Sequence, residues 1–189
     1  MNDAATAPWI VDTSCLGRVG LKGPAAADWL KQADIRIPEQ ANSWTSMESS
    51  GEASSLSLVA RLGSTEFFIE TESDSPRLRE LAQALENGQT QVYPVLRQDR
   101  AFVLGGKGVE SVLVQVCNVN FASLPLESNP VVLTLITGVA VVVVPQRERE
   151  GRRYRIWCDP SFGRYLWNTL RAIVVESGGE ELGIEQLRK

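Results

Sequence analysis

Few side chains of this sequence have the types and spacing that chemistry needs. Asp12 lies in an Asp-x-Ser element near the start of the chain, and Arg61 and Glu66 flank a Leu-Gly-Ser-Thr turn. Tyr154 begins a Tyr-Arg-Ile-Trp segment in the second half. A carboxylate accepts hydrogen bonds from a ring amine or an ammonium group, and an aromatic ring offers a stacking face. We predict these four residues as candidates for a cofactor-binding cleft, and we predict no catalytic residue.

Each candidate also has a simpler structural interpretation. An Asp followed by a turn often braces that turn through its own side chain, and Asp12 fits this pattern. Arg61 and Glu66 stand on opposite sides of a hairpin turn, where a cross-strand ion pair is common. The sequence therefore predicts a braced turn and an ion pair as alternatives to a cleft.

The sequence contains no histidine. Its absence excludes Ser-His-Asp and Cys-His nucleophile systems, and also zinc or iron sites with His ligands. The three cysteines, Cys15, Cys117 and Cys158, form no Cys-x-x-Cys pair and are too few for a metal centre of their own. We predict no metal site, and we expect three buried free thiols in a reducing compartment.

The formal net charge of −4 argues against a general nucleic-acid binder. Arg147–Arg153 is a local exception with four arginines, and we predict a solvated hairpin tip there rather than a site for an anion or a nucleic acid. Gly105–Gly108 fits no phosphate-loop spacing, so we interpret it as a turn that begins a helix.

Localisation is predicted from two segments. Met1–Ala4 shows no basic region followed by an apolar one, so we expect no signal peptide and a cytoplasmic protein. Val131–Val144 is shorter than the ~18–20 residues that a membrane span needs. We predict one or two buried strands in this stretch.

The elements that position the candidates follow a repeat. A shift of 83 residues places Gly20–Ala33 on Val103–Val116, with identities at leucine, glycine and glutamine positions. Both segments indicate the end of an apolar strand, a glycine turn and a helix. A shift of 84 residues places Ser75–Leu78 on Asp159–Phe162, and both indicate a polar N-cap followed by Pro at the first helical position.

The helices of the second correspondence have predicted buried faces. These are Leu78, Leu81, Ala82 and Leu85 in the first, and Phe162, Tyr165, Leu166, Leu170 and Ile173 in the second. Strands are predicted before each helix, at Leu56–Arg61 and Glu66–Glu70, and at Val131–Val144 and Tyr154–Trp157. The serine-rich segment Ser46–Ser55 is predicted to be a flexible loop, and Trp44 is placed in a loop as well.

These observations predict an α+β fold made by tandem duplication of a strand-helix-strands-helix unit. We expect one domain over residues 1–179, with pseudo-repeats at about 8–88 and 91–179, followed by a polar C-terminal tail at 180–189.

The order and spacing of five short segments resemble the gamma subunit family of heterotetrameric sarcosine oxidase. The segments are Val11–Ser14, Arg18–Ala26, Ala60–Ile69, Val92–Arg97 and Asp159–Trp167. That family is related to the folate-binding region of the glycine-cleavage T-protein, an aminomethyltransferase, whose fold is itself a tandem α+β duplication.

The resemblance implies a non-catalytic accessory subunit of a flavin-dependent sarcosine (N-methyl amine) oxidase. Flavin and NAD would then lie on larger partner subunits, and this chain would carry no cofactor of its own. The T-proteins have an R-x-G-Y-T-G-E motif in the folate cleft, whereas Leu133–Ala140 here keeps only Thr137 and Gly138 of it.

Two functions follow as hypotheses. In the first, the chain packs against larger oxidase subunits or associates with itself through an apolar face, with Trp167 a candidate interface residue. In the second, it is a stand-alone tetrahydrofolate-binding one-carbon protein that resembles an aminomethyltransferase. Tight binding of a reduced folate by the isolated chain would distinguish the second from the first.

Overall fold

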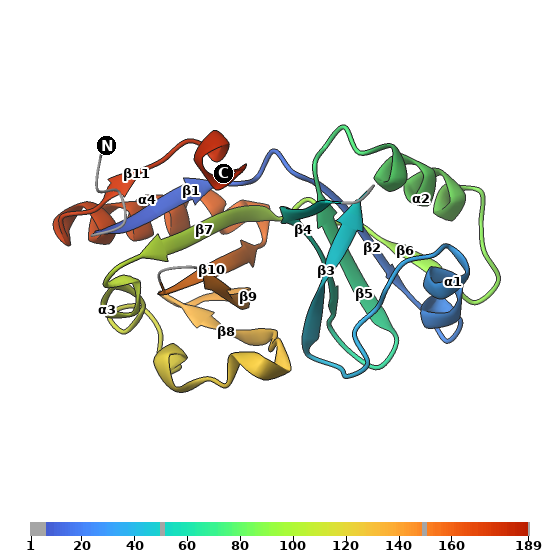
Figure 1. Cartoon of the computed structure of the whole chain (residues 1–189), viewed down its shortest axis with the longest axis horizontal. Coiled ribbons are helices and arrows are strands. Elements are labelled where there is room, and N and C mark those ends of the chain that lie inside the picture. The colour runs from blue at the N-terminus through green and yellow to red at the C-terminus, as the bar shows by residue number, and fades with distance from the viewer. Residues whose placement is uncertain (1–6, 50–51, 149–150, 189) are drawn as a thin grey trace. The chain divides into compact units, whose positions relative to one another are not determined.

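The computed structural model describes residues 7–49, 52–148 and 151–188 (Figure 1). Mainly antiparallel strands come in runs of two or three between the helices, which confirms the α+β class. The chain divides into two compact units. We call residues 15–98 the N-terminal unit, and residues 7–14 with 99–187 the C-terminal unit. Each is described by itself.

The N-terminal unit has a five-stranded antiparallel sheet in the order β3-β4-β5-β2-β6. Its strands are β2 (Gly17–Lys22), β3 (Ser43–Ser49), β4 (Glu52–Arg61), β5 (Glu66–Thr71) and β6 (Tyr93–Val95), and its helices are α1 (Ala26–Gln32) and α2 (Pro76–Glu86). The helices pack on one face of the sheet, where side chains such as Leu21, Val59, Phe67 and Ile69 meet Leu30, Leu78 and Leu81.

The C-terminal unit has a six-stranded sheet in the order β11-β1-β7-β10-β9-β8, in which only β1 and β11 run parallel. Its strands are β1 (Pro8–Asp12), β7 (Arg100–Gly106), β8 (Val132–Ile136), β9 (Val139–Glu148), β10 (Gly151–Cys158) and β11 (Glu180–Glu181). Its α-helices are α3 (Val109–Leu113) and α4 (Pro160–Glu176), with 3-10 turns at Phe121–Ser123 and Leu126–Ser128. A further 3-10 turn, Ile184–Arg188, begins in this unit and ends one residue beyond it. Phe102, Leu104, Tyr154 and Ile156 meet Leu113, Leu166 and Leu170 in its core.

The two sheets share one strand order. Read from β3 and from β8, the first five strands of each sheet are two hairpin strands, the strand that precedes the capped helix, the strand that precedes the short helix, and an outer strand, which is β6 in one sheet and β1 in the other. The short β11 then adds to β1 in the six-stranded sheet. The outer strands are exchanged along the chain: β1 precedes β2 but pairs with β7, and β6 precedes β7 but pairs with β2. The first repeat predicted at about 8–88 includes residues 8–14, and the sequence does not indicate that this strand pairs with β7. The correspondence supports the repeat, and the duplication itself stays a proposal.

The helices α2, α3 and α4 begin at the capping residues and glycines that the sequence indicates. The Ser75 side chain accepts from the amide of Leu78, and the Asp159 carboxylate accepts from the amide of Ser161 at 2.8 Å. Each cap precedes a Pro at the start of its helix, as predicted. Gly108 is the N-cap of α3 with φ of +86°, so the glycines before it do form a helix-start turn.

The prediction for the buried face of α4 is partly wrong. Phe162 and Tyr165 are 50 % and 53 % exposed, and the buried stripe consists of Gly163, Leu166, Leu170 and Val174. Gly163 explains the difference, because the stem of Arg100 lies where a Cβ at this position would be. The helix therefore turns its glycine toward β7, and its two aromatic side chains lie outside the contact.

The loop predicted at Ser46–Ser55 is also wrong for the described residues. Ser43–Ser49 is β3 and Glu52–Arg61 is β4, and they pair as a hairpin whose residues 50 and 51 lie outside the described part. Trp44 lies on β3 opposite Ala60 and not in a loop. The serines take strand geometry because pairing with β4 satisfies their backbone groups, which composition does not report.

The hairpin predicted around Arg147–Arg153 is confirmed by the pairing of Gly151 with Glu148, although residues 149–150 of its tip lie outside the described residues. Val131–Val144 holds two strands, β8 and β9, joined by a turn at Thr137 and Gly138. Within the described ranges, no helix is long and apolar enough to cross a membrane.

Candidate functional site

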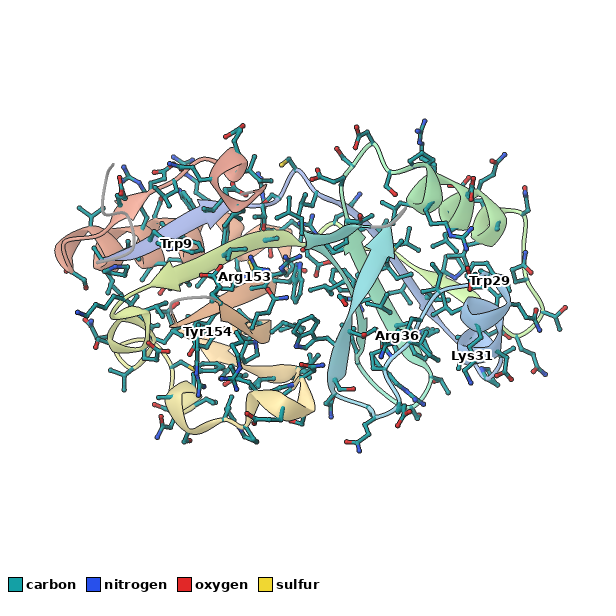
Figure 2. The ribbon with its side chains drawn as sticks, in the orientation of Figure 1. Trp9, Trp29, Lys31, Arg36, Arg153 and Tyr154 are labelled. Carbon is teal, nitrogen blue, oxygen red and sulfur yellow. The ribbon has the colours of Figure 1, made fainter. Side chains whose placement is uncertain are left out.

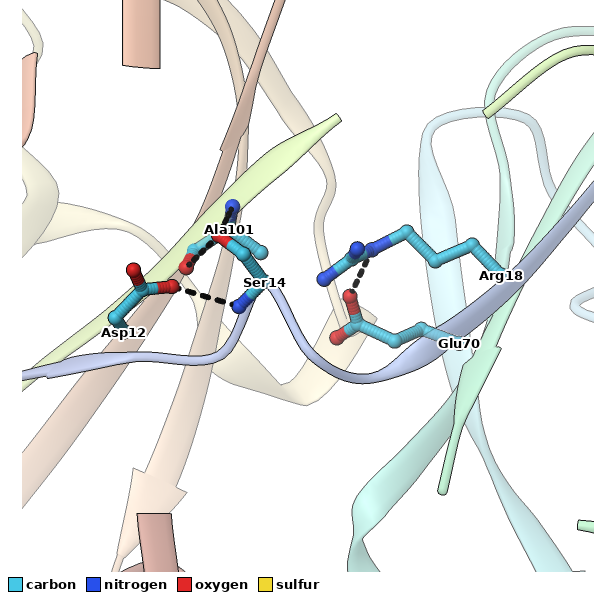
Figure 3. A network of polar contacts seen from close by, with 5 residues as sticks. All are labelled: Asp12, Ser14, Arg18, Glu70 and Ala101. Atoms are coloured by element: carbon cyan, nitrogen blue, oxygen red, sulfur yellow. Dashed lines mark hydrogen bonds and ion pairs between the residues drawn. The ribbon is translucent and has the colours of Figure 1, made fainter. Parts of the chain in front are cut away.

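Asp12 lies at the end of β1, exposed to solvent, and braces the turn that follows (Figure 3). Its Oδ1 accepts a hydrogen bond of 2.8 Å from the amide of Ser14. The Ser14 hydroxyl in turn accepts from the amide of Ala101 at 3.0 Å and donates to the carbonyl of Ala101 at 3.4 Å. The braced-turn interpretation therefore describes the observed geometry of Asp12.

Arg61 ends β4 and ties backbone segments together. Its guanidinium donates to the carbonyl oxygens of Pro38, Glu39, Gly63 and Ser64, at 3.3, 2.6, 3.3 and 2.8 Å. It also lies 5.5 Å from the centre of the Phe67 ring. The predicted ion pair between Arg61 and Glu66 does not form, because the carbonyls already use the donors of the guanidinium.

Glu66 pairs instead with Arg97, a partner that the sequence does not indicate. The Arg97 Nη2 atom lies 2.6 Å from Glu66 Oε1, and its guanidinium carbon stacks 5.2 Å from the centre of the Phe68 ring. Gly20 makes room for this side chain, since a Cβ there would meet the Cγ of Arg97 at 2.7 Å. An arginine, a carboxylate and an aromatic ring thus meet on one face of this sheet.

A second ion pair in the N-terminal unit is buried (Figure 3). Arg18 Nε lies 2.6 Å from Glu70 Oε2, and the two side chains are 5 % and 0 % exposed. The pair joins β2 to β5, where these residues face each other in register. Such a pair orients its strands, and it is costly to break because the remaining charge stays buried.

Tyr154 lies on β10 and is part of the core of the C-terminal unit (Figure 2). Its hydroxyl donates to Glu110 Oε1 at 2.9 Å, and the centre of its ring lies 5.3 Å from the centre of the Phe121 ring in an edge-to-face arrangement. Burial, and then the Glu110 carboxylate, raise the pKa of this phenol above its ordinary value. The ring has no exposed surface, so in this conformation it offers a ligand no stacking face.

A shallow hollow of about 240 Å³ lies beside this pair. Its lining is mainly apolar, with Glu110 as the charged group: Glu110, Ser111, Leu113, Val114, Val119, Asn120, Phe121 and Ala122. Pockets for drug-sized ligands usually measure roughly 300–1,000 Å³. The volume of the hollow lies below that range.

Three arginines in the described part of the β9–β10 hairpin, Arg147, Arg152 and Arg153, form contacts within the chain. Arg147 pairs with Glu127 at 2.8 Å, and Arg153 donates to Gln146 at 2.8 Å and to Glu148 at 3.4 Å. Arg152 donates to the carbonyl of Phe121 at 2.7 Å. Burial and the nearby Arg155 lower the pKa of Arg153. These contacts favour a structural role for the described part of the hairpin.

The prediction that all three cysteines are buried is wrong for one of them. Cys117 and Cys158 are buried as expected, but Cys15 is exposed in the connection between β1 and β2. Burial raises the pKa of the Cys158 thiol to about 11. Across the residues that the structure describes, no three His, Cys, Asp or Glu side chains are grouped to hold a metal.

The four candidates belong to different units and have different partners. Arg61 and Glu66 lie in the N-terminal unit, and Asp12 and Tyr154 lie in the C-terminal unit. The groups that sequence reasoning missed are Arg18, Glu70, Arg97 and Glu110. Two of them could be recognised in the sequence, because Arg18 and Glu70 are charged residues inside apolar strands. Their pairing depends on the register of β2 and β5, which the sequence alone does not provide.

Comparisons with known proteins show where this fold occurs. No family model matches the sequence, and no protein of curated function matches it either. A chain of the heterotetrameric sarcosine oxidase from Corynebacterium sp. U-96, solved with pyrrole 2-carboxylate, matches with a TM-score of 0.69 and 19 % identity. The match covers 96 % of this chain and 93 % of that one.

The glycine cleavage system aminomethyltransferase T from Bartonella henselae matches with a TM-score of 0.63 and 14 % identity. This match covers 97 % of the present chain but 50 % of the aminomethyltransferase, so the chain spans half of that protein's length. At these identities the similarity is one of fold. The resemblance expected from the sequence is confirmed at that level.

Proposed function

We propose that this chain is a non-catalytic accessory subunit of a heteromeric, flavin-dependent oxidase of sarcosine or a related N-methyl amine. The observation that carries the proposal is the extent of the fold match, which takes in nearly the whole of this chain and nearly the whole of one chain of a sarcosine oxidase. The aminomethyltransferase match leaves half of that enzyme without a counterpart here. A subunit role accounts for a full-length match better than a partial enzyme does.

The contacts of the candidate residues support a role without chemistry. Arg61 donates hydrogen bonds to backbone carbonyls, and Glu66 forms an ion pair with Arg97. Tyr154 packs in the core and donates a hydrogen bond to Glu110. Asp12 is exposed and braces its own turn. Flavin and NAD would then belong to larger partner subunits, and this chain would contribute surface rather than reacting groups.

Exposed apolar side chains support the same proposal. Large apolar side chains that are at least half exposed are Tyr93, Leu96, Val114, Leu133, Leu135, Phe162, Tyr165 and Val175. Six of them, from Val114 onward, lie in the C-terminal unit. Leu133 and Leu135 lie two residues apart on β8 and therefore share one face of that strand, and neighbouring exposed apolar side chains are typical of a surface that another protein covers.

The proposal is tested by purifying the tagged chain from its native host and identifying what elutes with it. We expect larger flavin-containing subunits in a fixed ratio, and loss of sarcosine oxidation or of complex stability when this chain is omitted. An unrelated tagged protein from the same host is the control. A chain that elutes alone and monodisperse would contradict the subunit role.

Binding of tetrahydrofolate is the second candidate function, favoured by the fold shared with an aminomethyltransferase. Its test is a calorimetric titration of the isolated chain with tetrahydrofolate, with a variant Asp12→Ala beside the wild type. Saturable binding that the variant weakens would favour this function and would make Asp12 a binding residue. Absence of heat at high ligand concentration would leave the subunit role as the better explanation.

A further inference from the structure

The two sheets have four edges in the described part of the chain, and three of them carry features that oppose pairing with another strand. The edge strand β11 is two residues long and consists of Glu180 and Glu181. The edge strand β6 is three residues long with Pro94 at its centre, which lacks an N–H donor. The edge strand β3 is interrupted by a register shift between Ser46 and Glu48.

The fourth edge, β8, has none of these features. Its five residues pair with β9 without a register shift, from Val132 opposite Val143 to Ile136 opposite Val139. The segment Ser128–Gln146 contains no charged residue, and β8 contains no proline. Leu133 and Leu135 project from the outer face of this edge and are 59 % and 57 % exposed. An uncharged edge with exposed leucines is a template for another strand.

We propose that β8 is the docking edge of this subunit, where one uncharged, extended strand of a larger oxidase subunit adds to the six-stranded sheet. The inference rests on the proposed function and names where the partner binds. Main-chain hydrogen bonds would supply affinity, and the leucine side chains would select apolar residues at alternate positions of the incoming strand. A charged residue in that strand would lose water without gaining an ion partner on β8.

The surroundings of the edge favour a larger partner over a second copy of this chain. The amide of Thr137, in the turn after β8, donates to the carbonyl of Val116 at 2.9 Å, and Tyr165 reaches the carbonyl of Thr137 at 3.4 Å. Tyr165 is 53 % exposed, and Val114, two residues before Val116, is 71 % exposed. Exposed apolar groups therefore flank the turn on the helix side of the sheet, and the leucines lie on its other side.

Two copies could pair through β8 in an antiparallel arrangement centred on Thr134, with each Leu133 opposite a Leu135. That contact would cover little more than two leucines per copy, whereas a stable interface buries about 800 Å² on each partner. It would also leave Tyr165 and Val114 in water. A larger subunit covers both sides of the edge, and the area that a stable complex needs thus favours it.

The test uses the flavin-containing subunits of the complex, freed of this chain and recombined with purified variants. Leu133→Lys with Leu135→Lys places charge on the edge, and Val175→Lys is the control. Val175 is an equally apolar residue, 50 % exposed near the end of α4 that leads to the opposite edge of the sheet. We expect at least tenfold weaker association for the double variant and no change for the control.

A second measurement needs no variant. Hydrogen exchange of the wild-type chain, alone and in the complex, reports the alternate amides of β8 that point away from β9. We expect them to become protected on association, with little change at β11. Unchanged exchange along β8, or undiminished association of the double variant, would overturn the docking edge while leaving the subunit role intact.

Two further outcomes would also overturn the docking edge. If the wild-type chain does not associate with the flavin-containing subunits at all, the proposed function and the docking edge fail together. If light scattering shows that the free chain is a dimer and the double variant is a monomer, the edge belongs to a second copy, and the proposal is overturned in favour of self-association.

Discussion

The hydroxyl of Tyr154 reaches the carboxylate of Glu110 at 2.9 Å from a side chain with no exposed surface. The bond joins the middle of β10 to the first turn of α3 and satisfies the one polar atom of a core ring. A residue whose chemistry suggested a ligand platform is thus a structural link between helix and sheet.

We predict that Tyr154→Phe lowers the free energy of unfolding by about 1–2 kcal/mol, because the ring stays but a hydrogen bond to a charged group is lost. Tyr154→Ala should cost roughly 3–5 kcal/mol, since it also leaves a cavity. Urea unfolding followed by circular dichroism measures both. Tyr165→Phe is the control, because Tyr165 is 53 % exposed, and it should change stability by less than about 0.5 kcal/mol. Equal effects of the two Phe variants would contradict this role for Tyr154.

Gly20→Ala should destabilise the N-terminal unit. A Cβ at Gly20 would lie 2.7 Å from the carbonyl oxygen of Val95 and 2.7 Å from the Cγ of Arg97, so both β6 and the Arg97 side chain must move. We expect a loss of about 1–3 kcal/mol in urea unfolding. Gly63→Ala is the matched control, because no atom lies within 4 Å of a Cβ there. A Gly20→Ala variant as stable as that control would contradict this prediction, because it would show that β6 can move away from the added Cβ without a loss in the free energy of unfolding.

The features that the sequence predicts correctly are encoded locally. Ser75 and Asp159 each precede a proline, and this short-range signal places the starts of α2 and α4. Hairpin strands in the second half follow from an apolar run of a length that sheets use. Features decided by distant pairing escape the same reasoning. The serine-rich segment forms β3 and β4 only because the strands pair with each other and with β5.

The candidate residues also divide into contacts that are local in the sequence and contacts that depend on distant pairing. The turn-bracing contact of Asp12 spans two residues and could be anticipated. The partner of Glu66 is Arg97, 31 residues away, and it depends on the notch that Gly20 leaves between β5 and β6. Nothing in the sequence near Glu66 indicates that geometry, so the sequence favours Arg61, the nearer cation, as the partner, and that prediction is wrong.

Breaking the buried ion pair should be costly. Glu70→Ala removes a buried carboxylate that lies 2.6 Å from the Arg18 guanidinium, which is 5 % exposed, and we expect a loss of about 3–5 kcal/mol in urea unfolding. Glu80→Ala is the control: it removes an exposed pair with Arg77, which should cost less than about 0.5 kcal/mol. The double replacement Arg18→Met with Glu70→Leu should recover most of the stability, because it removes both charges together. A double variant no more stable than Glu70→Ala would contradict this account.

Alkaline pH should destabilise the C-terminal unit through Cys158. Burial raises the pKa of its thiol from 9.0 to about 11, so the folded state favours the neutral form. The stability that this preference contributes is fully present below the unfolded pKa of about 9, and it is lost as the pH rises through about 11.

Cys158→Ala should therefore show a smaller loss of stability between about pH 8 and about pH 11 than the wild type, in urea unfolding at each pH. Cys15→Ala, which removes an exposed thiol, is measured beside it as the control for the loss of a cysteine. The measured quantity is the difference between the two pH values, so any cavity that the alanine creates affects both ends alike. Parallel pH curves for Cys158→Ala and the wild type would show that the buried thiol is not the group that titrates.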